Sequence, residues 1–191
     1  MAHFDHFDLL APLYEMVIKP KEPEELWRHL HLPTTGALLD VGGGTGRVAQ
    51  HMTGKADAVV IADLSCKMLA ESMQKPGLSA VCTPSETLPF PTGYFTRIIM
   101  VDALHHVIDQ QGTIDEMWRV LAPGGMVVIE EPDVRAFGVK LIALGEKLLL
   151  MRSHFLAPPR IADFFHSYAN AQVSIERDGP IAYIIATKAA A

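Results

Sequence analysis

Short apolar runs recur along the chain, separated by segments with helical spacing. Four of them lie at 37–42, 58–63, 97–103 and 126–131, and a weaker one lies at 78–84. Continuous apolar runs of this kind are typical of strands that are buried on both faces. Strand and helix alternate about five times, which predicts an open parallel sheet with right-handed crossovers and helices on both faces.

The C-terminal stretch follows a different pattern. Residues 171–189 contain two β-rich runs separated by "RDGP", which predicts an antiparallel hairpin added to the sheet edge. The expected fold is therefore α/β, with a seven-strand, mostly parallel sheet. A chain of 191 residues is suited to one core, so we expect a single domain over 1–191. Within it we expect an N-terminal helical cap at 1–32 and a helical, lid-like insertion at 132–170, between strands five and six.

The charge balance makes nucleic acid a poor partner. Lys and Arg number 16 against 22 Asp and Glu, which gives a net charge of -6, and the basic residues are scattered singly. An acidic surface without a basic patch repels phosphate backbones.

Cysteine usage and hydropathy favour a cytoplasmic protein. The two cysteines, Cys66 and Cys82, show no CxxC spacing, so we interpret them as reduced, small apolar core residues. The N-terminus has neither the basic nor the apolar region of a secretory signal. Charges interrupt the most apolar later stretch, 136–157, so no transmembrane helix is predicted, while peripheral membrane contact stays open.

A glycine-rich loop follows the first predicted strand, in "LLDVGGGTGRVAQHM" at 38–52. Such a loop typically presents backbone N–H groups to a ligand where the next helix begins. The dinucleotide fingerprint G-x-G-x-x-G, counted from Gly42, requires a glycine where Arg47 stands. The observed spacing is instead Gly42, Gly44 and Gly46, which disfavours an NAD(P)-linked oxidoreductase.

Two acids at strand ends favour a cationic ligand that carries a ribose. A carboxylate at Asp40, beside the loop, raises the cost of placing a pyrophosphate there. S-adenosylmethionine carries a sulfonium and an ammonium, so the same acid would favour its binding. Asp63 ends the second strand, where an acid can accept hydrogen bonds from a ribose diol.

Four segments in order resemble a known family over about residues 36–131. They are "LLDVGGGTGRVAQ", "VVIADLSCKMLA", "SETLPFPTGYFTRIIMVDALHHV" and "LAPGGMVVIEEPD". Together they are similar to the class I S-adenosylmethionine-dependent methyltransferases, and within them to the type 11 group that includes the ubiquinone/menaquinone biosynthesis methyltransferases. The resemblance implies the Rossmann-like class I methyltransferase fold, and "FDLLAPLYE" at 7–15 looks like the helix that precedes it.

The resemblance also implies roles for individual residues. Asp40, Gly42 and Gly44 would face the methionine moiety, in a loop that Gly46 completes. Asp63 would hold the ribose hydroxyls. The adenine would be lined by Leu64, Met68, Ser85 and Glu86, and the region beside the sulfonium by Asp102, Ala103 and His106.

Two positions depart from the family pattern. Pro84 stands where an aspartate usually accepts from the adenine amino group, and Thr96 replaces the usual aspartate before the fourth strand. Losing one hydrogen bond to a charged group costs about 1.5–3 kcal/mol, which would weaken binding without abolishing it.

The polar cluster "VDALHHVID" at 101–109 holds the candidate catalytic groups. His105 and His106 diverge by about 100° if helical, which disfavours a shared metal, so no metal is assigned. Methyl transfer depends mainly on alignment, with mild deprotonation by Asp102 or His106. Tyr14 and His106 are the candidate substrate contacts.

We therefore expect a methyltransferase acting on a small, apolar or aromatic acceptor. A protein that binds S-adenosylmethionine or S-adenosylhomocysteine for regulation, without turnover, stays an alternative. The sequence leaves open whether the chain is a monomer or a homodimer.

Overall fold

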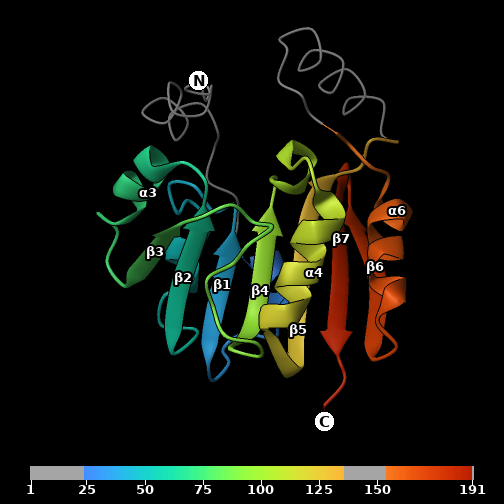
Figure 1. Ribbon diagram of the computed structural model, residues 1–191, viewed down its shortest axis with the longest axis horizontal. Coiled ribbons are helices and arrows are strands. Elements are labelled where there is room, and N and C mark those ends of the chain that lie inside the picture. Colours follow the sequence, from blue (N-terminus) through green and yellow to red (C-terminus); the bar gives the residue numbers. More distant parts are fainter. Residues whose placement is uncertain (1–23, 136–153, 191) are drawn as a thin grey trace, which may run out of the picture.

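The computed structural model describes residues 24–135 and 154–190. It contains one seven-stranded sheet in the order β3-β2-β1-β4-β5-β7-β6 (Figure 1). The strands are β1 (Ala37–Val41), β2 (Ala58–Asp63), β3 (Leu78–Cys82), β4 (Phe95–Val101), β5 (Leu121–Pro132), β6 (Ala171–Asp178) and β7 (Ile181–Lys188).

The direction of the strands confirms the predicted α/β architecture. β1 to β5 pair in parallel, while β7 is antiparallel to both β5 and β6. The strand order runs outward from β1 in one direction through β2 and in the other through β4. At such a switch point the connections diverge beyond the carboxyl ends of the two strands, which leaves a crevice for a ligand.

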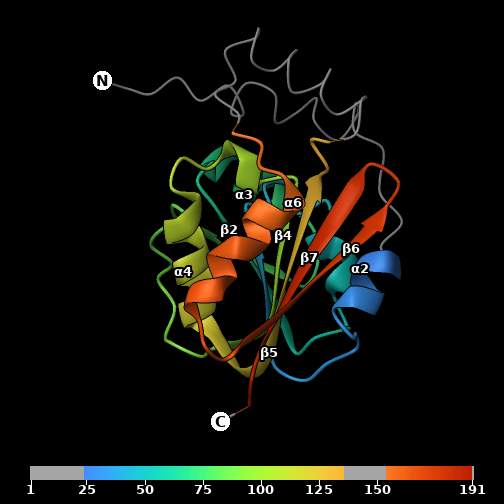
Figure 2. The ribbon, with the colours of Figure 1, turned by 90° about the vertical axis from the view of Figure 1, so that its right-hand side faces the viewer.

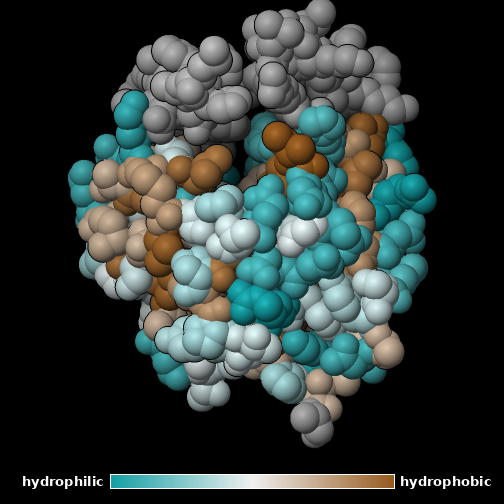
Figure 3. All heavy atoms as spheres, viewed as in Figure 1, coloured by the Kyte–Doolittle hydropathy of each residue, from teal (hydrophilic) through white to brown (hydrophobic). Residues whose placement is uncertain are grey.

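Helices cover both faces of the sheet. The α-helices are α2 (Glu24–His29), α3 (Cys66–Ser72), α4 (Gln110–Val120) and α6 (Pro158–Asp163), and the 3₁₀ turns are η1 (Ala49–Met52), η2 (Leu104–His106) and η3 (Phe164–Ser167). Figure 2 shows α4 and α6 on one side of the sheet and α2 on the other. Each side has its own buried apolar cluster, one containing Ile114 and Trp118 of α4 and the other containing Leu26 of α2. The outer surface over α4 is mainly hydrophilic (Figure 3).

Two of the predicted crossover helices are absent, although the strands they connect are present. After β1, the chain turns through Gly42, Gly44 and Gly46, which all have positive φ values, and then forms only the four-residue 3₁₀ turn η1. The prediction of an α-helix directly behind the glycine loop is therefore wrong.

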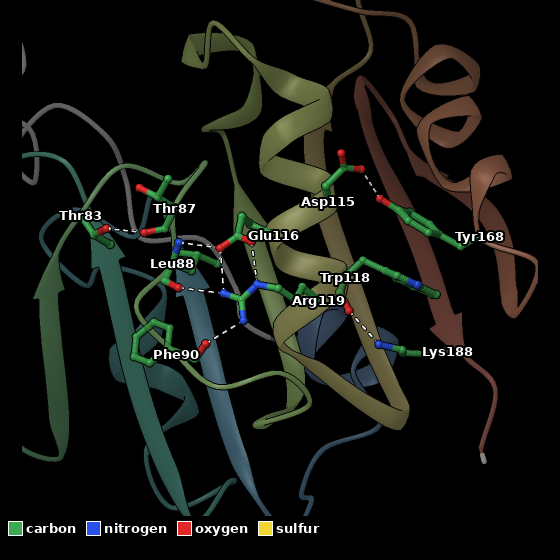
Figure 4. A network of polar contacts seen from close by, with 10 residues as sticks. All are labelled: Thr83, Thr87, Leu88, Phe90, Asp115, Glu116, Trp118, Arg119, Tyr168 and Lys188. Atoms are coloured by element: carbon green, nitrogen blue, oxygen red, sulfur yellow. Dashed lines mark hydrogen bonds and ion pairs between the residues drawn. The ribbon is translucent and has the colours of Figure 1, made fainter.

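The connection from β3 to β4, residues 83–94, also lacks a helix, and side chains of α4 hold it instead. Glu116 accepts from the backbone N–H of Leu88 at 2.8 Å. The Arg119 guanidinium donates to the carbonyl oxygens of Leu88 and Phe90, both at 2.9 Å (Figure 4). Because these side-chain bonds satisfy the backbone groups of the connection, it needs no helical hydrogen bonds of its own.

The interpretation of the cysteines as separate, reduced core residues is also wrong. Cys66 and Cys82 form a disulfide, with their Cα atoms 5.4 Å apart, and both residues are exposed. The parallel register pairs Asp63 with Cys82, so the first residue of α3 lies over the end of β3. The cysteines therefore give no support for a reducing compartment.

Several expectations fall partly or wholly outside the described residues. Tyr14, most of the expected cap at 1–32 and the first helical piece of the insertion are among them. The described part of the insertion contains α6 and η3. Within 24–135 and 154–190, none of the helices combines the length and apolar character that crossing a membrane requires.

Candidate cofactor site

The glycine loop forms one wall of the crevice beyond β1. Gly42 has a φ of 71° and Gly44 a φ of 51°, values that side-chain-bearing residues rarely adopt. A Cβ atom on Gly42 would lie 2.7 Å from the Cβ of Ala103, and one on Gly43 would lie 2.5 Å from Oδ2 of Asp40. The loop is therefore tightly packed against the ends of β1 and β4, and it presents backbone rather than side chains.

A cavity opens along this loop. Its lining consists of Asp40, Gly42, Gly43, Gly44, Thr45, Arg47, Val48, Met68 and Val101. Four of these residues are cofactor contacts predicted from the sequence: Asp40, Gly42, Gly44 and Met68. They come from β1, the loop and α3, and Val101 at the end of β4 closes the far side. The cavity thus lies at the switch point between β1 and β4, as the fold class predicts.

Asp63 ties the loop to the start of α3. One carboxylate oxygen accepts from the N–H of Gly44 and the other from the N–H of Ser65, each at 2.8 Å. Ser65 in turn caps α3 by accepting from the N–H of Met68. Asp63 therefore lies beside the loop at the end of β2, in a position to meet a ribose that enters the crevice.

Asp40 is an acid buried beneath the loop. It is 1% exposed, and neither carboxyl oxygen has a hydrogen-bond partner among the described residues. Burial, and secondarily the charge of Asp63, raises the pKa of Asp40 to about 8, against a smaller lowering effect of Arg47. At neutral pH the acid therefore carries a proton, which modifies the expectation of a permanent carboxylate. A cation in the cavity would favour its ionisation.

In the sequence, Arg47 matters only because it breaks the dinucleotide fingerprint. In the structure, it is also a candidate functional residue. Its side chain is 11% exposed and lines the cavity, and its Nη2 lies 3.8 Å from Oδ2 of Asp102. Asp102 follows β4 directly and has a φ of 50°, a strained value for a residue other than glycine. The ion pair joins Arg47, which lines the cavity, to the residue that directly follows the lining residue Val101.

The turn after β4 brings the other predicted residues to this edge. Ala103 packs against Gly42, and the half-buried His106 lies beside His105, with 4.0 Å between the ring centroids. Burial and the neighbouring His105 lower the pKa of His106 to about 3. At neutral pH His106 is therefore uncharged and a weak base.

The remaining predicted residues are less directly placed. Gly46 does not line the cavity, because its Cα faces Leu78, Ile61 and Ser72, and its role here is close packing. Leu64 is 67% exposed at the end of β2.

The two candidate adenine residues of the β3–β4 connection are engaged within the protein. The hydroxyl groups of Ser85 and Thr113 are 2.8 Å apart, and the Ser85 hydroxyl donates to Glu86 at 3.2 Å. Among residues 24–135 and 154–190, no three His, Cys, Asp or Glu side chains are grouped as metal ligands.

Fold and site together define an α/β domain with a cavity at the switch point, lined by the glycine loop and the buried acid Asp40. Residues 39–129 match the model of the family described as methyltransferase domain. This region is thus similar to the methyltransferase-domain family, which agrees with the resemblance that the sequence motifs show. The match does not support the alternative of an NAD(P)-linked oxidoreductase.

Individual relatives agree with this assignment. The chain is 31% identical over 135 residues to the ubiquinone/menaquinone biosynthesis C-methyltransferase UbiE of Coxiella burnetii. The aligned region covers 65% of this chain and 54% of that protein. The chain thus spans about half the length of the curated relatives it matches.

Solved structures show the same fold. An S-adenosylmethionine-dependent methyltransferase of Thermotoga maritima superposes with a TM-score of 0.77 at 18% identity, covering 95% of this chain and 97% of that one. One from Aquifex aeolicus gives a TM-score of 0.74 at 13% identity, covering 97% and 98%.

Proposed function

We propose that this protein transfers a methyl group from S-adenosylmethionine to a small, hydroxylated aromatic acceptor. The observation that carries the proposal is Asp40, which is buried, lines the cavity beside the glycine loop and has no hydrogen-bond partner within 24–135 and 154–190. A buried acid without a hydrogen-bond partner is costly unless a ligand supplies one. A cationic ligand supplies it, whereas a pyrophosphate would meet repulsion as soon as the acid ionised.

The residues around the cavity fit this cofactor. The loop backbone and Asp40 would receive the methionine moiety, with Arg47 placed to pair with its carboxylate once it is released from Asp102. The hydroxyl of Thr45, which is buried and has no partner among the described residues, offers a further polar contact. Asp63 would accept from the ribose hydroxyls, and Met68, packed against Gly44, would contact the adenine.

When bound, the cofactor supplies an activated methyl group, and the protein supplies alignment. In-line displacement requires donor and acceptor to be held at a near-attack distance, which can contribute about 7–11 kcal/mol. His106 is a weak base, so its role is to accept a hydrogen bond from an acceptor that is already acidic. Asp102, which pairs with the lining residue Arg47, is the other candidate proton acceptor.

The acceptor class follows from this weak basicity together with the relatives. A phenol, or a ring carbon activated by a neighbouring hydroxyl, needs only mild deprotonation. The relatives of known name are C-methyltransferases of ubiquinone/menaquinone biosynthesis. We therefore expect a hydroquinone-type ring whose carbon forms the new bond and loses its proton.

The test uses the protein with [methyl-¹³C]S-adenosylmethionine under anaerobic conditions. 1,4-Naphthohydroquinone offers free ring carbons beside a hydroxyl, and its 2,3-dimethyl analogue is the matched control in which those carbons are blocked. We expect a labelled C-methyl product from the first compound and none from the second. A ¹³C-methyl group on the oxygen of both compounds would show that the protein methylates oxygen instead of carbon. Tight cofactor binding without label in any hydroxylated aromatic acceptor would instead favour the regulatory alternative.

A further inference from the structure

One buried carboxylate holds three consecutive residues of the turn that follows β4. Glu131, near the end of β5, is 3% exposed. Its Oε1 accepts from the N–H of Ala103 at 3.1 Å and from the N–H of Leu104 at 2.8 Å. Its Oε2 lies 2.5 Å from Nδ1 of His105, which is 5% exposed. The side chain therefore replaces the regular backbone pairing that ends where β4 ends.

The same contacts determine the tautomer of His105. An imidazole nitrogen that faces a carboxylate oxygen within hydrogen-bond distance donates its proton to that oxygen. Because Oε1 already accepts from two amides, Oε2 is the acceptor for the proton on Nδ1. His105 therefore carries its proton on Nδ1, toward Glu131.

The turn held in this way contacts the cofactor loop on one side. Gly42 of the loop packs closely against Ala103, because a Cβ atom on Gly42 would lie 2.7 Å from the Cβ of Ala103. The loop and the turn therefore cannot shift independently. The ring of His106 lies against that of His105. Glu131 thus lies behind both the cofactor-facing and the acceptor-facing residues of the turn.

On its other side the turn contacts the chain that enters α6. The ring of Phe155 stacks on His105, with 4.2 Å between centroids and 13° between planes. The N–H of His154 donates to the carbonyl oxygen of His105 at 2.6 Å. Gln110 donates to the carbonyl oxygens of Leu104 and His154 at 3.0 and 2.9 Å. These contacts confine the ring of His105 between Glu131 and Phe155.

We propose that Glu131 is a positioning residue for methyl transfer, which holds the turn 102–106 against the glycine loop and fixes the ring and tautomer of His105. This inference rests on the proposed function. Glu131 does not line the cavity, and its hydrogen bonds go to Ala103, Leu104 and His105, so it acts through the turn. Its loss should therefore affect the rate of transfer more than the affinity for the cofactor.

The test compares Glu131→Gln with a matched control. The glutamine keeps the volume of the side chain and an oxygen for the two backbone amides, but its amide group donates toward His105. His105 must then accept at Nδ1 and carry its proton on Nε2. Glu176→Gln makes the same change on β6, where the side chain of Glu176 is half exposed and pairs with Arg28 and His29 of α2.

Two measurements are made on the wild type and both variants. Side-chain ¹⁵N spectra of the histidines report the tautomer of His105 and require no acceptor. Turnover of 1,4-naphthohydroquinone and calorimetric binding of S-adenosylhomocysteine separate rate from affinity. For Glu131→Gln we expect an inverted tautomer, a fall in kcat of about tenfold to a hundredfold, and cofactor-product affinity within about threefold of wild type. Glu176→Gln should match wild type in all three.

Three results would overturn the inference: His105 protonated on Nε2 in the wild type, an unchanged kcat in Glu131→Gln, or a loss of affinity as large as the loss of rate. A wild type that binds S-adenosylhomocysteine but methylates no acceptor contradicts the proposed function instead. In that case an Nε2 proton on wild-type His105 still rejects the assignment of Glu131. The two failures are therefore distinguishable.

Discussion

Replacing Asp40 by asparagine should change how the stability of the ligand-free protein depends on pH. The folded-state pKa of Asp40 is about 8, against an ordinary value of 3.8. Between these values the folded protein keeps a proton that the unfolded chain has lost. Stability therefore falls as pH rises from about 4 to about 8 and then levels off. Asparagine does not ionise, so its own effect on stability is independent of pH.

The size of the effect follows from the pKa difference. A difference of about four units at about 1.4 kcal/mol per unit gives a ceiling of about 6 kcal/mol above pH 8. Relaxation of the loop and water entry reduce this figure. Between pH 5 and pH 9, we expect the unfolding free energy of Asp40→Asn to rise relative to that of the wild type by at least about 2 kcal/mol.

Urea unfolding at pH 5, 7 and 9 measures this difference. The control is Asp57→Asn, which makes the same type of change beyond the opposite end of β1. Curves for Asp40→Asn and wild type that stay parallel across this range would refute the assignment of a buried, protonated Asp40. A second measurement uses calorimetry at pH 7 in buffers of different ionisation enthalpy. Binding of S-adenosylmethionine should release a proton from the wild type and not from Asp40→Asn.

Three further outcomes follow from named contacts. The double substitution Cys66→Ser and Cys82→Ser removes the disulfide. It should lower the unfolding free energy by about 3 kcal/mol, because the bridge closes a loop with a sequence separation of 16. Equal stability of the reduced and oxidised protein in urea would contradict this. Gly46→Ala should destabilise the fold by about 1–3 kcal/mol. Thermal unfolding measures that loss, and affinity for S-adenosylhomocysteine should be retained at low temperature, since Gly46 packs away from the cavity. Arg47→Leu should weaken S-adenosylhomocysteine binding by about tenfold, measured by calorimetry, and unchanged affinity would exclude Arg47 as the partner of the ligand carboxylate.

Most of the sheet could be predicted because buried parallel strands require continuous apolar runs. The hairpin at the C-terminus could be predicted because its two β-rich runs flank a short turn. The crossover after β1 could not, since helical spacing in the sequence does not reveal that Gly42, Gly44 and Gly46 are held at positive φ. The disulfide was missed because it depends on the register between β2 and β3, which sequence separation alone does not determine.

The candidate site shows the same division. Asp40 lies one residue before the end of β1, Asp63 ends β2 and Asp102 follows β4. The carboxyl ends of parallel strands share one edge of the sheet, so the convergence of these acids was predictable. The protonation of Asp40 was not, because it depends on complete burial beneath the loop. Glu131 was overlooked because its partners come from a different strand end, although two acids in succession at the end of an apolar run were a visible signal.

The central claim is that the crevice between the glycine loop and the ends of β1 and β4 binds S-adenosylmethionine. Calorimetric titration of the wild-type protein with S-adenosylhomocysteine, and separately with NAD, tests it most directly. We expect one site per chain for the sulfur compound, weakened by Asp40→Asn, and no heat from NAD. Saturation by NAD, or the absence of S-adenosylhomocysteine binding at millimolar concentration, would contradict the claim.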